Sequence, residues 1–362
     1  MVTMRQIAEE LNLSRSTVSY ALHERWRSKR VGPDTRQRIL DRAAALGYRR
    51  NHAAVSLKTR QTQTIGVIAP TVASDFVYQM LHGAETALQD DYTLLLGTSA
   101  WEASKEQRLI ESFEERRVDG MLIIHAGHAE IIPALKRLIT RGVPVVQVEH
   151  GFAQLESDVV QPDNEGLSYT LTRHLLDLGH RQICFIRSPR VHHGTLDRAK
   201  GYERAIREAG LAAHVFPVLP IDSRQPRFDF VSGLTRKALQ TISPPLGIVT
   251  NDLVSALGAL QAVEDAGLRC PDDVSICATT AVSDSAAIES NPVHRFLRVR
   301  FTTFEWSVEE MGRRAAMLLL DRLQNPQARH APFQKISIPG RLIVGDSTAR
   351  PPFSNAVQPH SK

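Results

Sequence analysis

Cysteine is scarce in this sequence, and long apolar runs are missing from it. The three cysteines among 362 residues, Cys184, Cys270 and Cys277, are an odd number without CxxC spacing. This pattern indicates neither a disulfide framework nor a structural zinc site, so we expect all three to be small core residues. No stretch approaches the roughly 18 consecutive apolar residues of a membrane-spanning helix, and residues 1–6 lack the features of a signal peptide. We therefore expect a cytoplasmic chain with no membrane partner.

The familiar catalytic motifs are also missing. The sequence has no GxxxxGK[ST] phosphate loop, no GxGxxG after a strand, no GxSxG elbow and no HExxH. We expect no enzyme activity and no cofactor. The segment His125-Ala126-Gly127-His128 and the pair His192-His193 lack cysteine or carboxylate ligands at useful spacing, so no metal site is expected either. Asp252 opens a helical pattern and is better explained as a helix cap than as a nucleophile.

The charge is concentrated at the N-terminus. Hydrophobic residues make up 42% and charged residues 23% of the chain, which is typical of a soluble globular protein with two or three domains. Residues 1–60 hold 13 Lys and Arg against five acidic residues, a net charge of +8. The remaining 302 residues carry 31 basic and 34 acidic residues, a net charge of −3. This asymmetry favours a polyanionic partner at the N-terminus; a solvated surface with chance clustering is the alternative.

The first 50 residues predict three short helices. Thr3-Met4-Arg5-Gln6 is a capping box, so a helix should begin at Met4. Ser14 can cap a second helix, and a third should follow Gly32-Pro33 and end at Gly47. Two short helices joined by a tight turn are typical of a helix-turn-helix, whose second helix lies in the major groove.

The polar face of the second helix is the expected reading surface. Its side chains are Arg15, Ser16, Ser19 and Tyr20, and Arg15 could bind a guanine for roughly 1–3 kcal/mol of discrimination. A three-helix bundle with an ordinary solvated face is the alternative. Residues 51–58 predict one or two helical turns capped by Asn51, too short to persist without a partner surface. A flexible linker is the alternative there.

From Ile65 the pattern changes to short apolar runs alternating with amphipathic helices. The expected strands are 64–69, 92–96, 121–124, 144–148, 182–186, 215–219, 246–250 and 274–278. The expected helices are 76–89, 104–116, 130–141, 164–178, 198–209, 228–240, 252–266 and 307–323. This alternation predicts two doubly wound parallel-sheet lobes, with the chain crossing near Pro162, Asn291-Pro292 and Asn325-Pro326.

Doubly wound sheets bind ligands beyond the carboxyl ends of their strands, which predicts a small molecule between the lobes. Polar residues at those ends could hydrogen-bond a hydroxyl-rich or anionic effector, although any single one of them is more often a surface or structural group. They are Ser74, Asp75, His125, Glu149, His150, Arg187, Ser188, Asn251, Asp252, Thr279 and Thr280.

The head of the chain resembles the headpiece of the lac-repressor (LacI) family of bacterial transcription regulators. The resemblance rests on the order and spacing of residues 2–8, 13–19, 35–36 and 46–48. It implies that Arg15, Ser16 and Tyr20 occupy base-reading positions. It also implies a hinge helix in which Leu57 is a wedge between base steps, Ala54 permits close approach and Lys58 lies near the minor groove. The DNA-binding set is Thr3, Ser14, Arg15, Ser16, Thr17, Ser19, Tyr20, His23, Asn51, Ala54, Leu57 and Lys58.

The head departs from the family at two places. Tyr20 stands where many members have arginine. The segment from Glu24 to Val31 is about three residues longer than usual, and its extra basic residues add phosphate contacts or simply form a solvated loop.

The resemblance continues through the core, at landmarks such as Ile65-Gly66-Val67, Val118-Asp119-Gly120 and Leu178-Gly179-His180. It implies that Arg198 anchors the effector, with paired sugar hydroxyls or a carboxylate as possible partners. It also implies that Phe228 stacks on the ligand. The effector-binding set is Ser74, Asp75, His125, Glu149, Arg198, Phe228, Asn251 and Thr280. Where the family commonly has an aspartate, this chain has Thr280, which weakens the case for an ordinary sugar.

The expected fold is a small all-α helix-turn-helix headpiece followed by a periplasmic-binding-protein-like α/β core of two doubly wound parallel-sheet lobes. The expected domains are a headpiece at 1–50, a hinge helix and linker at 51–62, a core at 63–348 and a flexible tail at 349–362. Within the core, the N-lobe would comprise about 63–162 and 292–325, and the C-lobe about 163–291 and 326–348.

The expected function is that of a sequence-specific DNA-binding transcription regulator, a repressor whose operator affinity is controlled by a small-molecule effector, a sugar or related metabolite. A homodimer or higher homo-oligomer would bind a near-palindromic double-stranded DNA operator. Two other classes stay open: a solute-binding receptor that shares the two-lobed core, and an α/β enzyme with an appended nucleic-acid-binding module.

Overall fold

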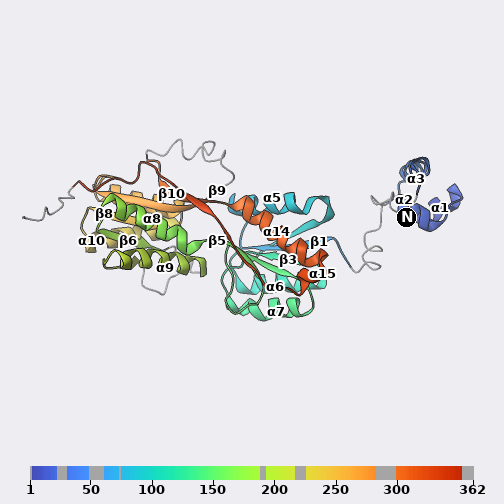
Figure 1. Cartoon of the computed structure of the whole chain (residues 1–362), viewed down its shortest axis with the longest axis horizontal. Coiled ribbons are helices and arrows are strands. Elements are labelled where there is room, and N and C mark those ends of the chain that lie inside the picture. Colours follow the sequence, from blue (N-terminus) through green and yellow to red (C-terminus); the bar gives the residue numbers. More distant parts are fainter. Residues whose placement is uncertain are drawn as a thin grey trace, which may run out of the picture. The chain divides into compact units, whose positions relative to one another are not determined.

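The computed structural model describes residues 2–22, 31–48, 61–72, 75–187, 193–216, 226–282 and 299–352. The chain forms two compact units, Met1–Thr62 and Gln63–Lys362. The first is a small helical body, and the second contains two β-sheets with helices on their faces (Figure 1).

The helical unit contains α1 (Met4–Leu11), α2 (Arg15–Ala21) and α3 (Pro33–Ala45). Its helices begin where the capping chemistry predicts. The Thr3 amide donates to Gln6 Oε1 at 2.8 Å, and the Gln6 amide donates back to Thr3 Oγ1 at 3.3 Å. Ser14 caps α2, and Pro33 stands at the first position of α3. The core of the unit consists of small and aliphatic side chains from all three helices and from Val31, which precedes α3: Ile7, Ala8, Val18, Ala21, Val31, Ile39 and Ala43.

The first sheet of the larger unit is parallel throughout and has the strand order β11-β5-β4-β3-β1-β2. Its strands are β1 (Thr64–Ala69), β2 (Thr93–Thr98), β3 (Gly120–Ile123), β4 (Val145–Val148), β5 (Asp158–Pro162) and β11 (Lys335–Ile338). Helices α5 (Asp75–Leu88) and α14 (Val308–Gln324) cover one face, and α6 (Ala103–Glu115) and α7 (Ile132–Thr140) cover the other. Short turns η2 (Gln89–Asp91) and η3 (Ala129–Ile131) and the small helix α15 (Pro326–Arg329) complete this lobe, called the N-lobe.

The second sheet, that of the C-lobe, has the order β12-β10-β9-β8-β6-β7, and only the β10–β12 pairing is antiparallel. Its strands are β6 (Gln182–Ile186), β7 (His214–Phe216), β8 (Leu246–Thr250), β9 (Val274–Val282), β10 (Thr302–Ser307) and β12 (Gly340–Ile343). Helices α8 (Asn164–Leu178) and α9 (His193–Glu208) pack on one face, and α10 (Arg227–Thr241) and α11 (Leu253–Asp265) pack on the other. Both lobes are therefore doubly wound, with mostly parallel strands buried on both sides.

The chain passes between the sheets three times, and the last two crossings differ from those expected. The first follows β5. The second lies at Ser307, between β10 and α14, and not near Asn291-Pro292, which is outside the described residues. The third lies between β11 and β12 and not at Asn325-Pro326. Asn325 instead caps α15, with Pro326 at its first position, so these turn residues mark a helix start.

The C-terminal segment is attached to the C-lobe beyond the expected end of the core. The Ala349 amide donates to Ser275 Oγ at 3.1 Å, and the Ala349 carbonyl lies 3.1 Å from His180 Nε2. Burial lowers the pKa of His180, so the neutral imidazole is favoured here. The prediction that the flexible tail begins at residue 349 is therefore wrong for Ala349, which is attached to the C-lobe.

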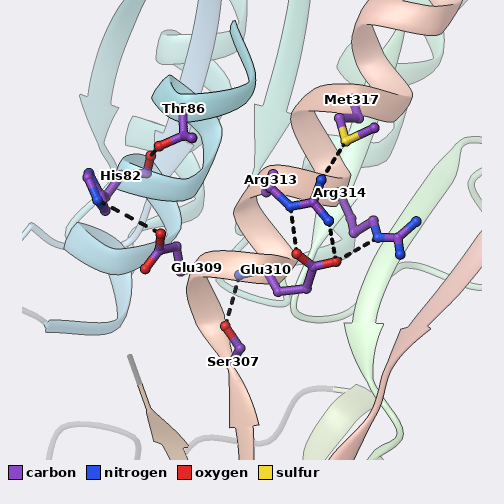
Figure 2. Close-up of polar contacts among 8 residues, drawn as sticks. All are labelled: His82, Thr86, Ser307, Glu309, Glu310, Arg313, Arg314 and Met317. Atoms are coloured by element: carbon purple, nitrogen blue, oxygen red, sulfur yellow. Dashed lines mark hydrogen bonds and ion pairs between the residues drawn. The ribbon is translucent and has the colours of Figure 1, made fainter. Parts of the chain in front are cut away.

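Helices α5 and α14 come from opposite ends of the core sequence and lie side by side on the N-lobe (Figure 1). They approach so closely that a Cβ on Gly312 would be 2.0 Å from Met80 O, and one on Gly83 would be 1.9 Å from Glu309 O. Figure 2 shows the polar contacts at the start of α14: Ser307 Oγ accepts the Glu310 amide at 3.0 Å, and Glu310 accepts hydrogen bonds from Arg313 and Arg314. His82 Nε2 on α5 lies 3.9 Å from the Glu309 carboxylate.

A buried ion pair fixes the outer edge of the N-lobe. Arg322 donates from Nε and Nη2 to the two Asp158 oxygens, each at 2.8 Å, and both side chains are at most 4% exposed. Asp158 Oδ1 also accepts the Gln334 amide at 2.8 Å. This network joins α14, β5 and the segment before β11.

In the part of the chain that the structure describes, none of the helices combines the length and apolar character that crossing a lipid bilayer requires.

Candidate functional site

Helix α2 presents a polar face in the headpiece, and a hydroxyl network fixes its first turn. Ser14 Oγ accepts the Thr17 amide at 3.0 Å and lies 2.7 Å from Ser16 Oγ and 2.8 Å from Thr17 Oγ1. Val18 and Ala21 point into the core. The opposite side of the helix, which carries Arg15 and Ser16, is exposed.

Arg15 is a cation at an unusual place. It is the first residue of α2, where the helix dipole disfavours positive charge, and no acidic residue stands in the first turn. Among the described residues it has no ion pair, unlike Arg42 of α3, which pairs with Glu10 of α1. Local stability does not explain this arginine, so its guanidinium is available for an anionic or hydrogen-bonding partner.

The other residues of the expected DNA-binding set have different environments. Tyr20 is 40% exposed, Ser19 is partly buried and Thr3 is engaged in the capping box of α1. His23, Asn51, Ala54, Leu57 and Lys58 lie outside the described residues, as does most of the Glu24–Val31 segment.

In the C-lobe, Arg198 is the centre of a buried polar cluster. Its side chain comes from α9, is 7% exposed and donates from Nε to Asn164 Oδ1 at 2.8 Å. Nη1 donates to Asn251 O at 2.7 Å and to Thr279 Oγ1 at 3.0 Å. Arg198 Cζ lies 5.4 Å from the centre of the Trp306 ring. Burial lowers the pKa of Arg198, and the negative charges of Glu149 and Asp252 oppose this effect.

Glu149 is an N-lobe residue that interacts electrostatically with the Arg198 cluster of the C-lobe. It follows β4 with a left-handed backbone, φ +74°, which a non-glycine residue adopts only at some energetic cost. Burial raises the pKa of Glu149, and the charges of Arg198 and Arg227 oppose the rise. The structure thus couples a carboxyl group of one lobe to two arginines of the other.

Asp252 and Arg227 form the part of this charge cluster that lies at two helix starts. Asp252 Oδ1 accepts the Ser255 amide at 2.9 Å and caps α11, as the sequence suggested. Asp252 Oδ2 lies 3.0 Å from Arg227 Nη1. Arg227 is the first residue of α10, directly before Phe228, whose side chain is 37% exposed.

Two expected effector residues of the C-lobe carry buried polar atoms without partners. Asn251 Oδ1 and Thr280 Oγ1 have no hydrogen bond to any described residue. The Asn251 carbonyl is occupied, because it accepts from both Arg198 and Thr279. The two free side-chain oxygens are positions where a ligand could bind.

The expected N-lobe residues are less uniform. His125 is fully buried, stacks on Phe152 with ring centres 3.7 Å apart, and contacts the edge of His150 at 4.3 Å. Its environment is that of a core side chain. Asp75 is exposed at the start of α5 and accepts from Gln79 Nε2 at 2.7 Å. Ser74 lies outside the described residues.

A titratable carboxyl group lies behind the loop that follows β3. Glu106 of α6 is fully buried, and its Oε1 accepts the Ala126 amide at 3.0 Å. Burial raises the pKa of Glu106 to about 7, against the opposing effects of that hydrogen bond and of His128. This group changes its charge near neutral pH.

Sequence reasoning missed four residues of the cluster: Asn164, Arg227, Thr279 as a direct partner of Arg198, and Trp306. Asn164 directly follows the β5 region, so the strand-end rule would have found it if β5 had been recognised. Trp306 lies on β10, which also was not expected to be a strand. Arg227 had no signal beyond its position before Phe228.

The chain is similar to known proteins over most of its length. Residues 172–348 match the model of a periplasmic binding protein-like domain. A ribose operon repressor of Haemophilus influenzae is 28% identical over 333 residues, which are 91% of this chain and 94% of that protein. The repressor PurR of Escherichia coli is 29% identical over 361 residues, 98% of each chain.

Solved structures show the same fold at lower identity. The lac repressor dimer bound to operator and the anti-inducer ONPF has a TM-score of 0.75 at 20% identity, covering 96% of this chain and 99% of that chain. The complex of the regulator CelR with cellobiose has a TM-score of 0.65 at 22% identity, covering 96% and 100%.

Proposed function

We propose that the chain is a member of the lac-repressor (LacI) family of bacterial transcription regulators, and that it is a DNA-binding repressor whose operator affinity depends on a small-molecule effector. Arg15 carries the proposal: a cation at the exposed start of α2 that has no ion pair among the described residues, in a segment with 13 basic and five acidic residues. Such a helix fits the major groove, and the surrounding charge fits the phosphates.

The effector binds between the two lobes in this proposal. Arg198, Asn251 and Thr280 supply polar groups from the C-lobe, and Glu149 supplies one from the N-lobe. A ligand in contact with both sides changes the balance between lobe arrangements. Residues 51–62 link the lobes to the headpiece, so this change alters DNA affinity by a coupling of about 1–3 kcal/mol.

The active species is a homodimer or a larger homo-oligomer, because one short recognition helix reads only half of an operator. Two subunits would bind a near-palindromic site. In this proposal the protein works in the cytoplasm and catalyses no reaction. Turnover of a sugar or nucleotide that is lost on changing Asp252 or Arg198 would favour the enzyme alternative instead.

The test compares two arginines of the headpiece in the full-length protein. An operator is first selected from genomic fragments, and its affinity is measured for the wild type, Arg15→Ala and Arg42→Ala. We expect Arg15→Ala to lose about 1–3 kcal/mol of operator affinity, because a base contact is lost. Arg42→Ala removes the same charge from a guanidinium already paired with Glu10, so its loss should be much smaller.

A thermal unfolding scan of each variant separates lost contacts from lost folding. Equal affinities of the wild type and Arg15→Ala would contradict the assignment of α2 as the reading helix. A wild-type protein that prefers no fragment, with or without metabolites, would contradict the proposed function itself.

A further inference from the structure

Arg198 is a buried cation whose direct hydrogen-bond partners are all neutral. Nε and Nη1 donate to Asn164, Asn251 and Thr279, whereas Nη2 has no partner among the described residues. No carboxylate of the described chain lies within 4.0 Å of this guanidinium, which is 7% exposed. A buried charge without a paired counter-charge is costly, so the open edge of Arg198 favours an anion.

Arg227 places a second cation near the first: Arg198 Nη1 donates to Asn251 O at 2.7 Å, and the next residue, Asp252, accepts from Arg227 Nη1 at 3.0 Å. The positive charge of Arg227 lowers the pKa of Arg198, an effect that adds to the larger effect of burial. Asp252 holds Arg227 through its Oδ2 atom at 3.0 Å while its Oδ1 atom caps α11. The position of Arg227 is therefore fixed by a residue that is itself fixed by a helix start. Two neighbouring positive charges repel each other, so negative charge close to them is needed to stabilise the pair.

The carboxylate that faces the two arginines from the N-lobe does not bind them directly. Among the described residues, the ion partner of Glu149 within 4.0 Å is His150, with Oε2 and Nδ1 3.8 Å apart. Glu149 interacts with Arg198 and Arg227 only over a longer distance. The pair of arginines thus has one carboxylate bound, that of Asp252, and another at a distance.

The unpartnered buried polar atoms of the candidate site include two donors, one acceptor and the Thr280 hydroxyl, which can donate or accept. Asn164 Nδ2 and Trp306 Nε1 are unpartnered donors, and Asn251 Oδ1 is an unpartnered acceptor. The orientation of the Asn164 amide is fixed because its oxygen accepts from Arg198. With the open edge of Arg198 and with Arg227, this surface suits a ligand rich in acceptor oxygens, with a hydroxyl to satisfy Asn251.

We propose that the effector carries an anionic group, a carboxylate or a phosphate, and that Arg227 binds this group together with Arg198. The proposal rests on the proposed function, since it names the chemical class of the effector and a further residue of its site. Both guanidiniums offer paired N–H groups that match carboxylate and phosphate oxygens. The ring of Phe228, which is 37% exposed, lies next in sequence and covers the apolar part of the ligand.

The experiment measures ligand binding without DNA. Full-length protein is screened by thermal shift against aldonates, uronates and sugar phosphates, each beside its neutral parent, with gluconate, glucose 6-phosphate and glucose as one set. Bound ligand raises the apparent stability by mass action. The best binder is then titrated calorimetrically against the wild type, Arg227→Gln, Arg227→Lys and Arg236→Gln.

Arg236→Gln is the matched control because Arg236 lies on the same helix, pairs with Asp265 and is 52% exposed. We expect an anionic member to bind at least about tenfold more tightly than its neutral parent, because only the anion uses both arginines. Arg227→Gln should weaken the anion at least about tenfold and leave the neutral parent unchanged. Arg227→Lys should restore part of the loss, and Arg236→Gln should have no effect. Carboxylate and phosphate members of the panel identify which anion is used.

The proposal is overturned if a neutral parent binds as tightly as its anion, if no anionic member binds, or if Arg227→Gln leaves the anion's affinity intact. Operator affinity of the same preparation is measured in parallel. Retained operator binding with any of these results rejects the anionic effector alone, whereas a ligand that binds without changing operator affinity counts against the proposed function.

Discussion

Glu106 is a carboxyl group that burial makes neutral at mildly acidic pH. The ordinary carboxyl pKa is 4.5, and in the folded chain the pKa of Glu106 is about 7. Its Oε1 atom holds the Ala126 amide, and its Oε2 atom has no hydrogen-bond partner among the described residues. Burying such a group in its charged form lowers the stability of the fold, whereas burying it in its protonated form has little effect. The loop whose Ala126 amide it binds follows β3.

The raised pKa predicts how stability depends on pH. The contribution of neutral Glu106 is fully present below about pH 4.5 and is lost as pH rises through about 7, a change of about 3 kcal/mol for a shift of this size. Glu106→Gln should therefore be more stable than the wild type at pH 8.5 and similar to it at pH 5. Urea unfolding at both pH values measures the difference.

The control for this prediction is Glu111→Gln, a change on the same helix at a partly exposed carboxylate that accepts from Gln107 at 3.0 Å. It should leave the difference between the two pH values unchanged. If Glu106→Gln shows the same pH dependence as the wild type, the assigned protonation is wrong.

At the scale of helices and strands, the sequence predicts best the elements that are buried on both faces. The expected limits of β1, β6, β8 and α8 agree with the structure to the residue. These strands are short apolar runs with turn residues at both ends. Burial on both faces requires apolar residues at successive positions, and this pattern is visible in the sequence.

Two of the strands that were missed, β5 and β10, carry buried carboxyl groups. In β5, Asp158 is buried with Arg322, which is distant in sequence, and in β10, Glu305 is 5% exposed and accepts from Thr303. From the sequence alone, a charged residue is assigned to the surface, because the partner that allows its burial is not visible there.

Of the expected effector residues, Arg198, Glu149 and Asn251 lie in one electrostatic cluster, but His125 packs in the core. The strand-end rule finds positions and does not tell which side chains face a ligand.

The close crossing of α5 and α14 predicts an asymmetric response to glycine substitution. Gly312→Ala would place a methyl group 2.0 Å from Met80 O, a backbone atom that cannot move without shifting α5. We expect a loss of about 1–3 kcal/mol or more in the free energy of unfolding. Gly233 of α10 has nothing within 4 Å of an added Cβ, so Gly233→Ala should stabilise by about 0.5–1 kcal/mol.

Both glycine variants are compared with the wild type by urea unfolding. Alanine at each position has the same propensity advantage within a helix, so the difference between them isolates the contact. A Gly312→Ala protein as stable as Gly233→Ala would show that α5 and α14 can separate without cost.

At the scale of the whole molecule, the positive charge is concentrated at one end of the chain. Residues 1–60 carry a net charge of +8 and the remaining 302 residues a net charge of −3. Under the proposed function, the core adds no net attraction for phosphates, so we expect the sequence-independent part of DNA binding to come mainly from the N-terminal segment.

This division predicts a steep dependence of operator affinity on salt. For a protein that contacts 6–10 phosphates, affinity falls by about 10³–10⁵ between 50 and 200 mM salt, because released counterions drive binding. Fluorescence anisotropy of full-length protein on operator DNA gives the slope, and a scrambled duplex gives the sequence-independent part. A flat response would mean that phosphate contacts are not the main source of affinity.

The order in which the sheets are completed has a consequence for biosynthesis. The N-lobe receives α14 and its edge strand β11 only after every parallel strand of the C-lobe has been made, and β12 follows last. When the first 300 residues have been synthesised, the sheets of both lobes still lack strands. Each nascent sheet then ends at a strand that the finished sheet covers, β5 in the N-lobe and β9 in the C-lobe. Truncated products should therefore be prone to aggregation and dependent on chaperones until the last few dozen residues emerge.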